Sequence, residues 1–153
     1  MGKYKRNNPL NVRYSVRNNW LGQDGKQGGF CVFKEERYGW RAAFILLKNY
    51  HSMGYSSVRK IIERWSPYRE NPTAEYMKFV SLRMQTLGYE SFNVPFEESA
   101  LDLRNDEVVI DLLMCMSVFE SGQYVQAKYI RAQLSEWLEV YSGDENCLKS
   151  KYS

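Results

Sequence analysis

Histidine and cysteine are scarce in this chain, and their scarcity excludes several kinds of site. The one histidine, His51, has no cysteine or serine pattern around it. The three cysteines are odd in number and show no CxxC spacing, so neither a zinc site nor a disulfide framework is indicated. A glycine-rich phosphate loop is also missing. We therefore expect no metal and no other cofactor.

Apolar runs long enough to span a membrane are missing as well. No stretch approaches the roughly 18 unbroken apolar residues of a membrane-spanning helix. The N-terminal sequence MGKYKRNNPLNVRYS has no apolar core of the kind that a secretory signal peptide carries. We expect cytoplasmic synthesis without a signal peptide and without a membrane span. An extracellular target would then be reached by another route.

Acidic residues are missing from the first 23 positions, which carry five basic ones: Lys3, Lys5, Arg6, Arg13 and Arg17. Residues 97–120 show the reverse bias, with Arg104 as their one basic residue. The net charge of +3 is too small to indicate a nucleic-acid partner, and no helix-turn-helix or RNA-binding motif is present. Two interpretations of the basic segment stay open. It binds an anionic polymer, or it is a polar segment that is simply solvated.

The overall composition is that of an ordinary globular protein, with 44% hydrophobic and 25% charged residues. A length of 153 residues suits one core, so we expect a single domain over 1–153 with flexible tails at 1–6 and 143–153. Aromatic residues are abundant at 15%, including 12 tyrosines. Such side chains suit sugar-binding clefts as well as half-buried packing.

Turn-forming residues are concentrated at the start of the chain, and helical patterns follow them. Asparagine and glycine dominate the first thirty residues, and short strands over 12–16 and 30–33 are expected to pair as a hairpin. Helical periodicity follows in several segments. The predicted helices cover 35–51, 56–65, 71–88, 106–120 and 124–141, with a short helix near 97–101.

The most informative segment is an almost unbroken apolar run over 108–119, followed by Glu120, Ser121 and Gly122. A helix that is apolar on every side is buried on every side, so this segment predicts a central core helix. Its last turn places Glu120 at the core edge near the negative helix end, and both effects raise a carboxyl pKa. Two interpretations stay open: a general acid for glycosidic bonds, or a surface glutamate before a Gly122 cap.

An ordered series of motifs resembles a family of phage- and prophage-encoded virion structural proteins. Those proteins read N-N-P-G-N-I-R, W-x-G and F-x-x-F, and this chain has NNPLNVR at 7–13, WLG at 20–22 and FCVF at 30–33. The likeness covers most of residues 7–125. Leu10 departs from the usual glycine, which affects the local turn. The resemblance implies phage or prophage origin, association with a virion and partners among its proteins.

The same motifs, in another chain order, are similar to those of bacterial cell-wall glucosaminidases and lytic transglycosylases. In those enzymes a helix ending in Glu-Ser precedes the asparagine-rich turn and the aromatic hairpin, whereas here FESG at 119–122 comes last. Termini that lie close together permit such a permutation. The resemblance implies a mainly α (α+β) fold of the lysozyme-like type, circularly permuted, although periodicity alone also permits any six-helix orthogonal bundle.

The resemblance implies a role for Glu120 as the acid that protonates a β-1,4 bond of peptidoglycan and then acts as a base. A second carboxylate is less evident. Glu35, Glu36 and Asp24 lie on or near the predicted hairpin, although acids in a first helical turn are favoured in any case. Lytic transglycosylases, by analogy, use a single glutamate because a hydroxyl of the sugar itself is the nucleophile.

Four further residues are candidates for contacts with a sugar. Tyr76 lines a cleft or packs in the core beside Phe79, and the two interpretations are equally supported. Asn71 lines the cleft or caps the helix that begins near Pro72, with capping favoured. Asn8 and Asn11 bind substrate or hydrogen-bond their own backbone, and the second role is the more common.

Three functions therefore compete. The first is a peptidoglycan-cleaving glycosidase or lytic transglycosylase of phage or prophage origin, with Glu120 as acid and base. The second is a non-catalytic virion or cell-wall-binding protein that keeps the fold. The third, a nucleic-acid-binding protein, has the weakest support. The sequence leaves open whether this chain is an enzyme at all.

Overall fold

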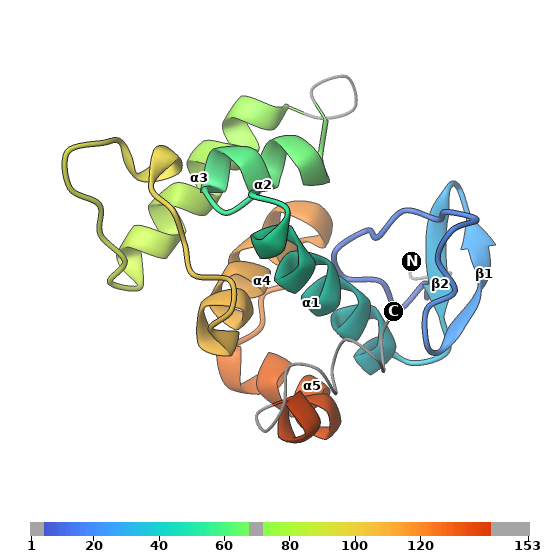
Figure 1. The fold of residues 1–153 in the computed structure, drawn as a ribbon. Coiled ribbons are helices and arrows are strands. Elements are labelled where there is room, and N and C mark those ends of the chain that lie inside the picture. The colour runs from blue at the N-terminus through green and yellow to red at the C-terminus, as the bar shows by residue number, and fades with distance from the viewer. Residues whose placement is uncertain (1–4, 68–71, 142–153) are drawn as a thin grey trace.

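The computed structural model describes residues 5–67 and 72–141, which form five α-helices, one 3₁₀ helix and a two-stranded antiparallel sheet. The helices gather on one side and the hairpin stands on the other, with the N-terminal loop between them (Figure 1). The prediction of a mainly helical α+β class is confirmed, and the lysozyme-like layout stays a prediction. Both predicted tails, apart from Lys5 and Arg6, lie outside the described residues.

The hairpin consists of β1 (Gln23–Gln27) and β2 (Phe30–Phe33). Gly28 and Gly29 connect the strands with positive φ values of 60° and 86°, which a tight two-residue hairpin turn favours. The predicted hairpin at β2 is present, but its other strand is β1. Residues 12–16 form no strand and pair with β2 only through an antiparallel bridge between Arg13 and Phe30. The two-glycine turn joins β2 to the segment that comes directly before it.

The segment around Val12 runs beside β2 without forming a named strand. The backbone N–H of Cys31 donates to the Val12 carbonyl oxygen at 2.9 Å, and the Tyr14 N–H donates to the Gly29 oxygen at 2.9 Å. Asn7 and Asn11 have positive φ values of 55° and 52°. Asparagine tolerates this left-handed conformation better than most residues, so the loop can fold back at both positions.

Helix α1 (Glu36–Ser52) crosses the centre of the molecule and is buried over much of its surface (Figure 1). At Gly39 the helix and the asparagine-rich loop approach so closely that an added Cβ would lie 2.0 Å from the Asn7 carbonyl oxygen and 3.0 Å from Pro9 Cδ. The absence of a side chain at Gly39 therefore fixes how the loop sits against α1.

Replacing Gly39 by alanine is expected to lower the free energy of unfolding by about 3 kcal/mol, the upper end for overpacking, because the obstacle is backbone. Gly54→Ala is a suitable control. Nothing lies within 4 Å of its added Cβ, and only its φ of +85° is unfavourable. That variant should lose about 1–2 kcal/mol. Urea unfolding of both variants measures the difference, and equal losses would mean that the close approach at Gly39 is unimportant.

Helices α2 (Val58–Trp65) and α3 (Thr73–Thr86) pack against each other, and both contact the 3₁₀ helix η1 (Phe96–Glu98). Ser57 caps α2, as the sequence indicates, because its hydroxyl accepts a hydrogen bond from the Lys60 N–H at 3.2 Å. These elements cover the end of the helical layer that lies away from α5 (Figure 1).

Helix α4 (Asp106–Ser121) is the central helix, in contact with α1, α3 and α5 (Ala127–Tyr141). The burial predicted from the apolar run is confirmed for most of its length. Its fully enclosed side chains include Val109, Ile110, Leu112, Leu113, Cys115 and Met116. The helix ends at Gly122, which has a φ of 68° and donates its N–H to the Val118 oxygen at 2.8 Å.

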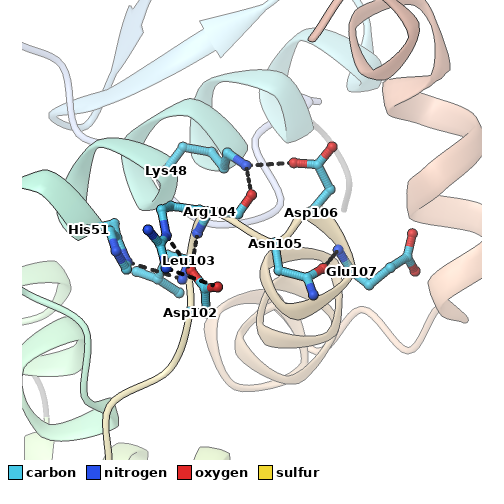
Figure 2. Close-up of polar contacts among 8 residues, drawn as sticks. All are labelled: Lys48, His51, Asp102, Leu103, Arg104, Asn105, Asp106 and Glu107. Carbon is cyan, nitrogen blue, oxygen red and sulfur yellow. Dashed lines mark hydrogen bonds and ion pairs between the residues drawn. The ribbon is translucent and has the colours of Figure 1, made fainter. Parts of the chain in front are cut away.

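The start of α4 is tied to α1 by a buried lysine. Lys48 Nζ lies 2.5 Å from Asp106 Oδ1 and donates to the Arg104 carbonyl oxygen at 2.7 Å (Figure 2). Asn105 caps the helix by accepting a hydrogen bond from the Glu107 N–H at 2.9 Å. One turn along α1 from Lys48, His51 Nδ1 accepts the Leu103 N–H at 3.2 Å. These bonds determine where α4 begins and hence where its other end lies.

Two expectations, that the chain has no membrane-spanning helix and no metal site, can be compared with the described part of the chain. None of the helices in 5–67 and 72–141 is long and apolar enough to cross a membrane. Within the same ranges, no group of histidine, cysteine, aspartate and glutamate side chains is arranged to hold a metal ion.

Candidate active site

Glu120 lies in the last turn of α4, where the helix meets the asparagine-rich loop. The Asn11 side-chain amide donates to Glu120 Oε1 and to the Glu120 carbonyl oxygen, both at 3.0 Å. The next residue, Ser121, donates its hydroxyl to the Pro9 carbonyl oxygen at 2.9 Å. Two side chains therefore join the end of α4 to a loop that is more than 100 residues away in sequence.

Burial raises the pKa of the Glu120 carboxyl above its ordinary value. The Asn11 amide, the Tyr76 hydroxyl and the positive charge of Arg13 act in the opposite direction, with smaller effects. A carboxyl group with this balance holds its proton to a higher pH than an exposed one.

Tyr76 lies beneath the carboxylate, on α3. Its ring stacks on Phe119 with centroids 4.1 Å apart and planes at 14°, and the residue is 1% exposed. Its hydroxyl faces Glu120 closely enough to interact electrostatically, yet it forms no hydrogen bond of regular geometry with any residue in the described ranges. Burial first, and the Glu120 charge second, raise the pKa of Tyr76. The phenol therefore stays protonated beside the carboxylate.

Asn8 belongs to the scaffold of this site. Its amide nitrogen donates to the Val12 and Cys31 carbonyl oxygens at 3.0 and 2.9 Å, and its Oδ1 accepts the Val12 N–H at 2.8 Å. The residue is buried, and these bonds hold the loop against β2. Asn8 therefore hydrogen-bonds backbone groups, which is the second of the two roles expected for it. Asn11, in contrast, contacts the candidate acid. The fourth candidate, Asn71, lies outside the described residues.

The three candidates for a second carboxylate lie in different surroundings. Asp24 and Glu35 are exposed, and Glu35 accepts a hydrogen bond from Arg37 at 3.0 Å. Glu36 is half-buried and accepts three hydrogen bonds. Its donors are Trp40 Nε1, Gln123 Nε2 and Tyr129 OH, each at 2.8 Å. This arrangement fixes Glu36 as a link between α1 and the segment after α4.

Asn11 also lies on the walls of two pockets. A pocket of about 280 Å³ is lined by Asn11 together with Lys5, Arg6, Asn7, Asn8, Pro9, Glu36, Ser121 and Gln123. A second pocket, of about 170 Å³, is lined by Asn11 together with Val12, Arg13, Asn18, Leu46, Tyr50, Arg64 and Trp65. The sequence interpretation selected neither Tyr50 nor Arg64 as a site residue. It named Arg13 only as one of the five basic residues of the acid-free N-terminal segment.

The chain is similar to a phage protein. Protein P5 of Pseudoalteromonas phage PM2 is 34% identical over 92 residues, which cover 50% of this chain and 51% of that protein. The chain therefore spans about half the length of the curated relative that it matches. No protein-family model matches the chain. The similarity supports the expected phage origin and does not extend to cell-wall enzymes.

Proposed function

We propose that this protein cleaves β-1,4 glycosidic bonds of peptidoglycan during phage infection, with Glu120 as the acid and base. The observation that carries the proposal is the environment of Glu120. A half-buried carboxyl with a raised pKa is held by Asn11 and faced by a protonated tyrosine. Asn11 lines two pockets, and Ser121, the residue after Glu120 in α4, lines one of them. Proton donation to a leaving oxygen needs such a group.

The surroundings of the other carboxylates favour a single-carboxylate reaction. Glu36 shares a pocket wall with Asn11, but three donors already occupy its oxygens, and Asp24 and Glu35 are exposed. In the reaction of a lytic transglycosylase, Glu120 gives its proton to the glycosidic oxygen as the bond to C1 breaks. The C6 hydroxyl of the same sugar then forms a bond to C1 and returns its proton to Glu120. Atoms and charges balance without a second carboxylate or a water molecule.

The products of digestion test this proposal. Purified peptidoglycan is incubated with the protein, and the soluble fragments are examined by mass spectrometry. We expect fragments with 1,6-anhydro ends, which are one water molecule lighter than hydrolysis products. Reducing ends would instead mean hydrolysis and a second catalytic group. If several wall types release no fragments, the alternative of a non-catalytic virion or wall-binding protein becomes the better account.

A further inference from the structure

Charges of opposite sign gather in two regions of this chain. Residues 5–34, which include the asparagine-rich loop and the hairpin, hold six basic residues and one acid, Asp24. Residues 87–111, which connect α3 to α4 and begin α4, hold seven acids and one basic residue, Arg104. Figure 1 shows the hairpin at one edge of the molecule and the loop after α3 at the opposite edge. The hairpin and this loop therefore do not meet within one copy of the chain.

Cations and an apolar side chain are exposed together beside the hairpin. The Arg13 guanidinium lies 5.1 Å from the centre of the Phe30 ring, and Lys26 Nζ lies 4.6 Å from the centre of the Tyr14 ring. Both contacts hold a cation in place without neutralising its charge. Val16, which is 88% exposed, comes two residues after Tyr14. We define the basic surface by four exposed residues: Arg13, Val16, Arg17 and Lys26.

The loop after α3 exposes apolar side chains beside acids. Phe92 is 76% exposed, Val94 46% and Leu87 45%. Exposed apolar side chains that lie close together are typical of surfaces that bind another protein. The acids of this loop give such a surface a negative charge. We define the acidic loop by five residues: Leu87, Glu90, Phe92, Val94 and Glu97.

Contacts with the rest of the protein hold the acidic loop in one shape. The Tyr89 hydroxyl donates to Asp111 Oδ2 at 2.7 Å, and the Ser91 hydroxyl donates to the Val94 carbonyl oxygen at 2.9 Å. Phe96, near the other end of the loop, is buried in the core. A loop that is already ordered loses little conformational entropy when it binds a partner. The exposed apolar side chains are thus presented on a fixed support.

We propose that the acidic loop of one copy binds the basic surface of a second copy. The two surfaces are opposite in charge, and each has a largely exposed apolar side chain, Phe92 on the loop and Val16 beside the hairpin, that the contact removes from water. Because the surfaces lie on opposite sides of the molecule, the contact is head-to-tail. Head-to-tail contacts build open chains or closed rings instead of symmetric dimers. This association is independent of the proposed enzymatic function.

Sedimentation of the unmodified protein measures the association. We expect a Kd on the order of 10 µM, at the weak end of specific interfaces, with species larger than dimers at higher concentrations. The association should weaken as salt rises from about 0.1 M to about 1 M, because the Debye length falls from about 10 Å to about 3 Å. A protein that stays monomeric at about 1 mM, or that associates more strongly in high salt, would overturn the inference.

Charge reversal identifies the two surfaces. Glu90→Lys combined with Glu97→Lys is expected to weaken association at least ten-fold, because like charges then face each other. Arg17→Glu combined with Lys26→Glu should have the same effect. In an equal mixture of the two double variants, each contact between unlike copies again joins opposite charges. Association should therefore return in the mixture, and its return would also show that both variants are folded.

Two further variants complete the experiment. Glu63→Lys combined with Glu75→Lys is the matched control, because it changes the net charge as the loop variant does, at exposed positions on α2 and in the first turn of α3. It should associate as the unmodified protein does. Phe92→Ser should weaken association about ten-fold, as loss of an aromatic side chain from an interface does. Loss in only one of the two reversed variants, no recovery in their mixture, or an equal loss in the control would overturn the inference.

Discussion

Glutamine in place of Glu120 is expected to reduce the release of peptidoglycan fragments at least 100-fold, and as much as about 10⁴-fold, the range typical of general acid–base catalysis. Gln keeps the shape of the side chain and can still accept the hydrogen bond from Asn11, but it has no proton to give to a leaving oxygen. Rates of fragment release from labelled sacculi measure the effect. Glu35→Gln is the control, because Glu35 is an exposed carboxylate and should be replaceable without loss.

The same substitution should make the protein more stable near neutral pH. Because burial raises the folded-state pKa of Glu120, its carboxyl favours folding fully below the ordinary value of 4.5 and loses that contribution as pH rises through the folded value. Glutamine carries no charge at any pH. We therefore expect a higher melting temperature for Glu120→Gln at about pH 7, with the difference shrinking at about pH 4. A variant that is inactive and also less stable at pH 7 would indicate a merely structural glutamate.

The helical part of this fold could be predicted because each helix carries its own signal. The run over 108–119 predicts a buried helix by composition alone, and Ser57 and Gly122 are typical residues for a helix start and a helix end. The hairpin was less predictable. Residues 12–16 alternate as a strand does, but pairing depends on the turn, and Gly28–Gly29 selects the segment just before it.

The candidate site could be predicted only in part, because its groups come from distant segments. The resemblance put Glu120 and the asparagine-rich turn in one lysozyme-like domain, and the structure adds that Asn11 contacts Glu120. Sequence could not distinguish Asn11 from Asn8, since the difference lies in whether the amide bonds to β2 or to α4. The environment of Glu36 was equally hidden, because its donors come from α1, from α5 and from the segment between α4 and α5.

Methionine in place of Lys48 is expected to lower the free energy of unfolding by about 2–4 kcal/mol, near the range for breaking a buried ion pair. The Lys48 side chain is 5% exposed, and its removal leaves Asp106 without the partner that lies 2.5 Å away. Asp106 is 23% exposed, so water offsets part of the loss. Arg131→Gln is a matched control, because Arg131 pairs with Glu107 in the same first turn of α4 at an exposed position. That variant should lose less than about 1 kcal/mol.

A double substitution, Lys48→Met with Asp106→Leu, separates the charge from the packing at this end of α4. If the penalty arises from a partly buried carboxylate that has lost its partner, the double variant should recover much of the stability that Lys48→Met loses, as measured by urea unfolding. No recovery would mean that the Lys48 contact with the Arg104 carbonyl oxygen is the more important one. Because Lys48 and Asp106 determine where α4 begins, and Glu120 lies at its other end, a loosened start should also weaken catalysis. Equal stability of Lys48→Met and Arg131→Gln would contradict this account of how the fold positions Glu120.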